Sequence, residues 1–358
     1  MAYTDIDKPS DYFNTKLYTG NSSTQSITGV GFQPDFVWTK GRSQARNGSA
    51  YDSVRGVGIS IYTNSTIAEF ANPTSLTSFD SDGFTLGGNS QSNWSSSTYV
   101  AWNWKAGTAF TNDASGTGIG SIDSAGSVNT DAGFSIVSWT GNGADATIAH
   151  GLSQAPTIYF VKNRADVADW RVGQVLGGNI MTGGNGYYME LNDTKASTNP
   201  GSAVTWGSTP TAPTSSVFTV GSNNAHNGSS DAMIAYCFHS VKGYSKMGSY
   251  VGNGNADGTF VYTGFKPAFV MTKRTDSADN WGLLDNKRDG YNLTNKALTP
   301  NGTGAEYTSN SPAGDFVANG FKIRQSDGVI NASGGTYIYM AFAESPFTTS
   351  TGIPATAR

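Results

Sequence analysis

The sequence predicts an all-β protein made of three tandem β-sandwich modules of the jelly-roll or concanavalin-like type. Glycine accounts for 45 of the 358 residues, nearly twice the usual share of about 7%. Charged residues make up 13% and aromatic residues 12% of the chain, whereas an average domain is roughly 25% charged. Such a chain has ample apolar surface to bury, and its many short apolar runs between Gly, Asn and Ser turns favour strands over helices.

Internal repetition is the second indication of this fold, because four landmarks recur three times in the same order. The landmarks are an aromatic residue before a Gly-Asn turn, a strand after a proline, a Phe-centred strand and an apolar strand containing Ala. They lie at 18–21, 34–42, 82–86 and 99–104, at 139–142, 156–164, 217–220 and 233–238, and at 250–253, 267–274, 320–323 and 337–342.

The repeats divide the chain into modules at 1–107, 132–243 and 244–349. Residues 108–131 are rich in Gly, Ser, Asn and Thr, so we expect a flexible linker or an exposed loop there. Residues 350–358 are expected to form an extended or disordered tail. Each sandwich should bury a core of its own, so that the modules follow one another like beads rather than like the turns of a solenoid.

The landmark strands differ in the burial that their patterns predict. Residues 36–38 and 159–161 are continuous apolar runs, as expected for strands covered on both faces. Residues 84–86 and 218–220 alternate between apolar and polar side chains, as expected for strands with one face in water.

Charge and cysteine content exclude several classes of function. The net charge is −4 and Lys and Arg are not clustered, which argues against nucleic-acid binding through phosphate neutralisation. The single cysteine, Cys237, rules out an intrachain disulfide and a thiolate zinc cluster. The first ten residues lack a signal-peptide pattern and no apolar run approaches 18 residues, so we expect a soluble protein without membrane insertion.

Two Asp-Arg pairs with the same spacing are the first candidate site residues. They are Asp52 with Arg55 in the first module and Asp285 with Arg288 in the third, whereas the second has Gln174 in this region. A catalytic acid has no reason to recur in two modules and vanish from the third. We therefore interpret the pairs as ion pairs that close loops.

The sequence offers little for metals or cofactors, and none is expected. Asp80 and Asp82 resemble the opening of a calcium loop, but the remaining EF-hand spacing is missing, so an Asx-Gly turn is the favoured interpretation. His150, His226 and His239 lack zinc-binding spacing. No nucleophile elbow, P-loop or dinucleotide fingerprint occurs.

Two tryptophans in polar loops are the candidate binding residues. Trp94 and Trp206 lie among Asn, Ser, Thr and Gly, a composition typical of sugar-stacking or protein-docking loops. The alternative is that each tryptophan caps its own sandwich.

Five segments give the chain a family resemblance: 11–21 (DYFNTKLYTGN), 27–38, 51–56 (YDSVRG), 76–84 and 98–107 (TYVAWNWKAG). Together they resemble a family of uncharacterised structural proteins encoded by marine tailed phages, cyanophages among them. The resemblance is dense in the first module and looser in the other two. It implies a virion component with β-sandwich modules, and it supplies no activity or catalytic residues.

The leading hypothesis is a non-enzymatic virion structural protein on the particle exterior, as a head decoration, head fibre, tail fibre or tail appendage. It would be assembled in the host cytoplasm and bind other capsid or tail proteins. We also expect a homo-oligomer and contact with host-surface glycans. One alternative is a carbohydrate-active enzyme such as a polysaccharide depolymerase, which predicts paired carboxylates in one module with one pKa raised. The other is a free carbohydrate-binding module protein.

Overall fold

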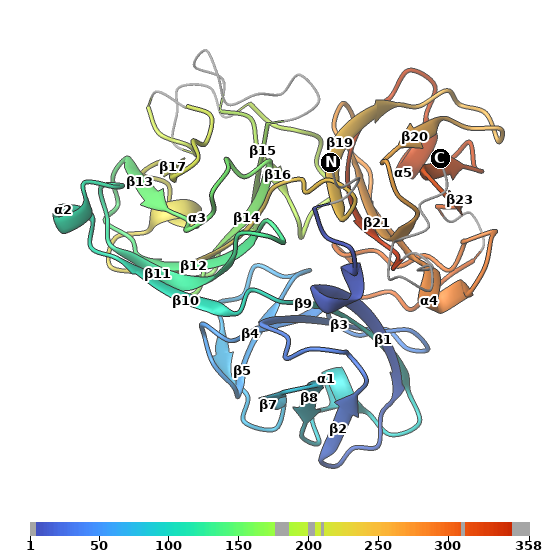
Figure 1. Ribbon diagram of the computed structural model, residues 1–358, viewed down its shortest axis with the longest axis horizontal. Coiled ribbons are helices and arrows are strands. Elements are labelled where there is room, and N and C mark those ends of the chain that lie inside the picture. Colours follow the sequence, from blue (N-terminus) through green and yellow to red (C-terminus); the bar gives the residue numbers. More distant parts are fainter. Residues whose placement is uncertain (1–4, 176–185, 200–204, 209–210, 309–311, 346–358) are drawn as a thin grey trace.

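Three β-sandwiches lie around a common centre in the computed structural model (Figure 1). The structure describes residues 5–175, 186–199, 205–208, 211–308 and 312–345, so the expected tail at 350–358 lies outside the described residues. The chain passes from one sandwich to the next in sequence order, and the three lobes form a triangle. The predicted all-β class of sandwich modules is confirmed.

The first sandwich packs a six-stranded sheet, in the order β1-β9-β3-β4-β5-β6, against a three-stranded sheet, β2-β8-β7. Its elements are η1 (Pro9–Asp11), β1 (Phe13–Thr19), β2 (Gln25–Thr28), β3 (Phe36–Gly41), β4 (Ser49–Asp52), β5 (Ile59–Tyr62), β6 (Phe70–Ala71), β7 (Leu76–Asp80), β8 (Gly83–Leu86), α1 (Ser90–Asn93) and β9 (Thr98–Trp104).

The second sandwich has a seven-stranded sheet, β10-β11-β12-β18-β14-β15-β16, and in its described part a two-stranded sheet, β13-β17. Its elements are β10 (Thr108–Asn112), α2 (Ala114–Thr117), β11 (Ser124–Asn129), β12 (Phe134–Thr140), β13 (Ala146–Ala149), β14 (Ile158–Asn163), β15 (Arg171–Gln174), β16 (Met189–Glu190), β17 (Val217–Val220), α3 (Asn224–Asn227) and β18 (Ala232–Phe238).

The third sandwich pairs a four-stranded sheet, β19-β25-β21-β22, with a three-stranded sheet, β20-β24-β23. Its elements are β19 (Ser245–Val251), β20 (Phe260–Tyr262), β21 (Pro267–Arg274), β22 (Trp281–Asp285), α4 (Asn286–Asp289), β23 (Gly314–Val317), β24 (Gly320–Ile323), α5 (Gly328–Asn331) and β25 (Thr336–Ala343).

The larger sheets share one topology. In each, the first strand of the repeat pairs with the last strand, the last strand pairs with the strand after the proline, and that strand pairs with the one that follows it in sequence. These runs are β1-β9-β3-β4, β12-β18-β14-β15 and β19-β25-β21-β22. β3 and β14 are buried at every position, so the expected burial on both faces is confirmed. β8 and β17 alternate with partly exposed residues, also as expected. One face of each larger sheet covers its own sandwich core, and the other faces the centre of the molecule.

The largest core is shared by all three sandwiches, so the expectation of separate beads is wrong. Each sandwich has its own cluster between its two sheets, but a larger cluster fills the centre. Its large side chains include Phe36, Trp38, Trp102 and Trp104 from the first sandwich, Phe134, Phe160, Trp170, Tyr236 and Phe238 from the second, and Phe269, Met271, Trp281, Met340 and Phe342 from the third. Aromatic residues on the second face of each larger sheet make this core possible.

The prediction of a flexible linker or exposed loop at 108–131 is also wrong. β10 and β11 lie inside it and extend the larger sheet of the second sandwich, where β11 pairs with β12 along its length. The helix α2 between them is capped by Asp113, which accepts a hydrogen bond from the amide of Gly116. Small polar residues suggested a linker, but small residues also fit the narrow space against a neighbouring strand. A Cβ at Gly126 would lie 1.9 Å from the carbonyl oxygen of Ile136.

A buried asparagine pins the Gly-Asn turn in every sandwich. Asn93, Asn227 and Asn331 end the one-turn helices α1, α3 and α5, and each is 0% exposed. In the first sandwich, the Asn93 side chain accepts from the amide of Asn21 and donates to the carbonyls of Ser23 and Gly87. The glycine of each turn is required by close approach, since a Cβ at Gly20 would lie 2.3 Å from the Trp94 carbonyl oxygen.

Candidate functional site

The contacts between sandwiches repeat at all three interfaces, and most of the buried charged side chains take part in them. The Lys in each strand that follows the proline is buried, and its ammonium donates to a carbonyl of the preceding sandwich in a closed cycle. Lys162 donates to Thr66 (2.9 Å) and Lys273 to Thr194 (3.0 Å), and Lys40 donates to Gly302. Burial lowers the pKa of Lys40 to about 7 and the pKa values of Lys162 and Lys273 to about 8.

Backbone hydrogen bonds follow the same cycle. The amide of Glu69 donates to the carbonyl of Arg164 (3.0 Å), and the amide of Glu306 donates to that of Arg42 (2.8 Å). At the third interface, the amide of Ser197 donates to the carbonyl of Thr275 (2.9 Å). Two interfaces have the same backbone register, since Glu69 and Ser197 each lie three residues after the carbonyl that accepts from the lysine. At the interface of the third and first sandwiches, Glu306 lies four residues after Gly302, so the register there is longer by one residue.

The predicted ion pairs are confirmed, and each also binds a neighbouring sandwich. Arg55 donates from Nε to Asp52 at 2.5 Å, and both side chains are fully buried. The hydroxyl of Tyr236, in the second sandwich, donates to the same Asp52 carboxylate at 2.6 Å. Arg55 also approaches Glu69, which forms a two-bond ion pair with Arg164 of the second sandwich.

The same network recurs between the third and first sandwiches. Arg288 donates from Nε to Asp285 at 2.6 Å, with both side chains fully buried. The indole Nε1 of Trp102, in the first sandwich, donates to this carboxylate at 3.1 Å. Glu306 lies 3.5 Å from Arg288 and forms a two-bond ion pair with Arg42.

The missing pair in the second sandwich has a physical explanation. The strands β9, β18 and β25 align so that Trp102, Tyr236 and Met340 occupy equivalent positions. Trp102 and Tyr236 carry donors that a neighbouring carboxylate can accept, whereas Met340 carries none. The second sandwich, which has Gln174 in place of the aspartate, is the one whose neighbour supplies Met340. A buried carboxylate there would lack its second donor.

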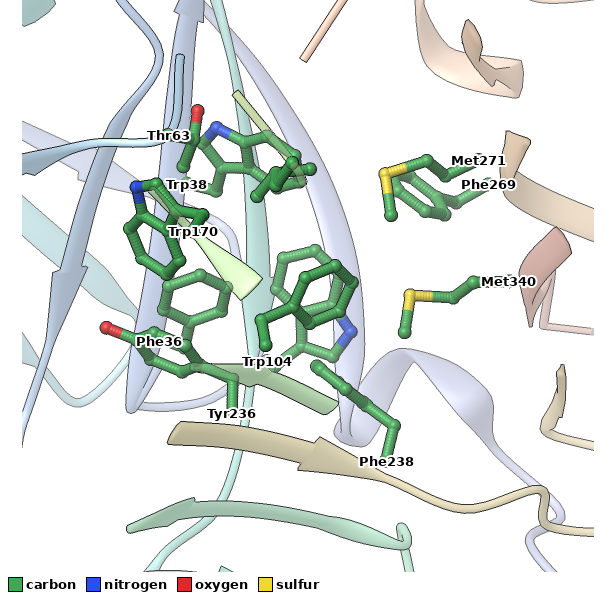
Figure 2. A pocket seen from close by; sticks show the side chains of 12 residues that line it. Phe36, Trp38, Thr63, Trp104, Trp170, Tyr236, Phe238, Phe269, Met271 and Met340 are labelled. Carbon is green, nitrogen blue, oxygen red and sulfur yellow. The ribbon is translucent and has the colours of Figure 1, made fainter. Parts of the chain in front are cut away.

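A small apolar chamber lies where the three sheets meet (Figure 2). Its volume is about 30 Å³. It is lined by Phe36, Trp38, Thr63, Trp104, Phe160, Trp170, Leu191, Tyr236, Phe238, Phe269, Met271 and Met340. One or two water molecules would fit by volume, but a water needs several polar partners and these walls are almost wholly apolar. The chamber is therefore a gap in the packing of large rings, and its walls bring no acid, base or nucleophile together.

The two tryptophans predicted to bind a ligand differ in exposure. Trp94 is 46% exposed beside α1, with the guanidinium carbon of Arg46 5.4 Å from its ring centroid, so its exposure is confirmed and its binding role stays a prediction. Trp206 is 0% exposed, so its predicted exposure is wrong. Its ring packs edge-on against Tyr159 in the core of the second sandwich, and it caps that sandwich as the alternative interpretation held.

Asp80 and Asp82 form a turn between β7 and β8, and their carboxylates serve different contacts. Asp80 accepts from the hydroxyls of Ser78 and Thr85, both at 2.7 Å. Asp82 accepts from the amides of Gly31 (2.6 Å) and Gly29 (3.0 Å), and these bonds lower its pKa. Across the described residues, no three His, Cys, Asp or Glu side chains gather into a group that could hold a metal ion. The geometry thus supports the turn.

The histidines and the cysteine are core residues. His150, His226 and His239 are at most 3% exposed, and burial lowers the pKa of each, to about 4 for His150. Cys237 is fully buried, and burial raises the pKa of its thiol. In the described residues, no helix is long and apolar enough to cross a membrane.

Two sets of structural residues that repeat with the landmarks were not predicted from the sequence. One set is the buried asparagines that hold the Gly-Asn turns, and the other is the buried lysines that bond to the preceding sandwich, here called the lysine clamps. Asn93, Asn227 and Asn331 each stand five or six residues before an apolar landmark strand. Lys40, Lys162 and Lys273 each stand within the strand after the proline. The available signal was a polar residue that recurs at a fixed place in each repeat, inside the strand after the proline for the lysines and shortly before the last landmark strand for the asparagines.

Comparison with known families places this architecture in one of them. A search of the curated proteins finds no match to the chain. A family described as a domain of unknown function, DUF7483, matches residues 8–346, which span all three sandwiches. The chain therefore belongs to the DUF7483 family.

Proposed function

We propose that the protein is a non-enzymatic structural component on the exterior of a tailed-phage particle, at the head or the tail. The observation that carries this proposal is the single core shared by three sandwiches and closed by a cycle of interface contacts. Such a block is stiff, and stiff scaffolds that carry many loops are suited to surface attachment and recognition. The phage assignment itself comes from the resemblance of segments such as 11–21 and 98–107.

Burial of the charged groups supports a structural role for the Asp-Arg pairs that recur in the first and third sandwiches. Asp52, Asp285 and Glu190 are each buried and each bonded to arginine. Asp35 is also buried, and it accepts from the Ser53 hydroxyl and the Ala106 amide. These acids hold loops and interfaces, so they are not free to transfer protons to a substrate.

The test is the composition of purified particles. We expect peptides of this chain in particles that have been purified by density gradient, and three-lobed density on the particle exterior by cryo-electron microscopy. Antibody labelling of intact particles separates an exterior site from an internal one. Absence of the chain from mature particles would overturn the proposal.

Glycan cleavage is a second candidate, and one observation favours it. Burial raises the pKa of Asp279 in the third sandwich, and the nearby Asp327 carboxylate raises it further. Glycosidases use such a pair, with one carboxyl group kept protonated. Release of reducing ends from polysaccharide by the wild-type chain, lost in Asp279→Asn and in Asp327→Asn, would establish it. Equal release by the wild type and both variants would exclude this pair.

A further inference from the structure

The outer sheet of the third sandwich departs from its two counterparts at exposed positions. Val261 of β20 pairs with Phe321, as Ile27 pairs with Phe84 and Ile148 with Phe218, so these strands can be aligned residue by residue. In the third sandwich the aligned exposed residues are Val251, Phe260 and Tyr262. The first sandwich has Thr19, Ser26 and Thr28 there, all exposed, and the second has Thr140, Thr147 and Ala149, of which Ala149 is buried.

The three substituted side chains are open to solvent. Val251 is 56%, Phe260 45% and Tyr262 54% exposed. Phe260 and Tyr262 flank the buried Val261, so they lie on the same outer face of β20, about 7 Å apart along the strand. Since two sister sandwiches fold with small side chains at these positions, packing of the sandwich does not require the aromatic residues.

A pocket of about 420 Å³ adjoins Tyr262 at the junction of the second and third sandwiches. Its walls are Ser240, Lys242, Gly243, Ser245, Lys246, Met247, Tyr262, Thr263 and Gly264. The only charged side chains among them are two lysines, although the chain as a whole carries a net charge of −4. The pocket is within the usual volume range of small-ligand sites, about 300–1,000 Å³.

Lys246 connects the pocket with the aromatic face. Its ammonium lies 5.1 Å from the centroid of the Tyr262 ring and donates to the Tyr262 carbonyl at 2.8 Å. An ammonium has three donors, so two remain for a ligand. Within the described part of the chain, no carboxylate forms an ion pair with Lys246.

We propose that this face, made of Phe260, Tyr262 and the lysine pocket, binds an acidic polysaccharide. A sugar ring presents a flat apolar face that can lie on Tyr262, and its carboxylate or sulfate would accept charge-assisted hydrogen bonds from Lys246. Phe260 extends the platform to a second sugar unit. A stable protein partner would need about 800 Å² on each side, whereas three exposed apolar side chains beside a cationic pocket suit one extended glycan.

The proposal rests on the exterior role proposed above for its biological setting, but its test is independent of particles. Isothermal titration calorimetry would measure binding of the full chain to an oligogalacturonate, to a heparin-derived sulfated oligosaccharide and to neutral maltoheptaose. We expect binding to at least one acidic oligomer, at least tenfold weaker in 0.5 M salt, and no binding to the neutral one. Absence of binding to both acidic oligomers would overturn the proposal.

Three variants locate the site, and the two at aromatic positions restore the residues of the first sandwich. Phe260→Ser and Tyr262→Thr should each weaken acidic-oligomer binding at least tenfold, and Lys246→Gln at least fivefold. The control Thr28→Ala, at the position in the first sandwich that matches Tyr262, should leave affinity within twofold. Unchanged affinity in all three variants, with circular dichroism spectra like the wild type, would contradict the proposal.

Two further comparisons distinguish glycan binding from simple anion binding and from the proposed exterior role. Inorganic phosphate should compete at least a hundredfold less well than the oligosaccharide; equal competition would reveal a simple anion site and overturn the glycan assignment. If the chain proves absent from particles yet binds acidic oligomers at Tyr262, the exterior role fails while this inference stands. If particles carry the chain and binding is absent, the inference alone fails.

Discussion

At the scale of single residues, the Tyr236 hydroxyl anchors the interface between the first and second sandwiches. Tyr236→Phe removes the donor that reaches Asp52 from the neighbouring sandwich. Because hydrogen bonds to charged groups are worth about 1.5–3 kcal/mol, we expect the free energy of unfolding to fall by that amount in urea titrations. Tyr244→Phe is the matched control, since the Tyr244 hydroxyl is buried and has no hydrogen-bond partner among the described residues. Its stability should change by less than about 0.5 kcal/mol, and an equal loss in both variants would contradict the anchoring role.

A second prediction at this scale concerns acid. His150 donates from Nε2 to the Thr214 carbonyl and accepts at Nδ1 from the Leu152 amide, so its ring is held neutral. Its pKa is about 4 in the fold, below the value of about 6.5 expected in the unfolded chain. Between these values the unfolded state binds more protons, so stability is complete above pH 6.5 and is lost as the pH falls. The slope is about 1.4 kcal/mol per pH unit, roughly 3 kcal/mol in total.

The measurement is urea unfolding of the wild type and of His150→Gln at pH 7 and at pH 4.5. The difference in the free energy of unfolding between these two pH values should be smaller in the variant by about 2–3 kcal/mol. His226, His239 and carboxyl groups with shifted pKa values such as Asp35 remain in both proteins and supply the rest of the acid dependence. Identical pH dependence of the two proteins would mean that His150 is not held neutral.

At the scale of elements, the lysine clamps join strands of one sandwich to loops of the next. The fully buried Lys162 donates to Thr66 across the interface and to Ala168 within its own sandwich. Lys162→Met keeps the apolar stem but removes the buried ammonium. The Thr66 carbonyl still accepts from the Ala168 amide, whereas the Ala168 carbonyl loses its donor, so we expect a loss of about 1–3 kcal/mol in the free energy of unfolding. The exposed Lys287→Met should cost less than about 0.5 kcal/mol. Similar losses for both would show that the buried ammonium contributes nothing specific.

Elements also show what the sequence could and could not predict. Each landmark strand was predictable, because period and turn residues are local signals. β10 and β11 were not, since small polar residues read as a linker until a neighbouring strand is known to crowd Gly126. Trp206 lies in a polar local context and is buried only by residues distant in sequence. The Asp-Arg pairs were predictable as ion pairs from spacing, but their donors Tyr236 and Trp102 belong to other sandwiches.

At the scale of the whole molecule, the shared core decides how the protein unfolds. Trp104 touches rings from all three sandwiches, namely Phe13, Phe36, Phe238, Phe269 and Phe342. Separation of any sandwich from the other two would expose this aromatic surface to water. We therefore expect one cooperative calorimetric transition for the full chain, with an enthalpy of roughly 250 kcal/mol near 60 °C and a van't Hoff enthalpy close to it.

The variant Trp104→Ala makes the argument quantitative. Removal of a buried tryptophan should cost about 3–5 kcal/mol. Because the core is shared, the whole transition should move to lower temperature as one peak. The matched variant Phe84→Ala removes a ring from the core of the first sandwich alone. If the sandwiches unfolded independently, Trp104→Ala would split the trace and leave the peaks of the second and third sandwiches in place. That pattern would contradict the shared core as the source of cooperativity, since a substitution at the centre must weaken all three lobes together.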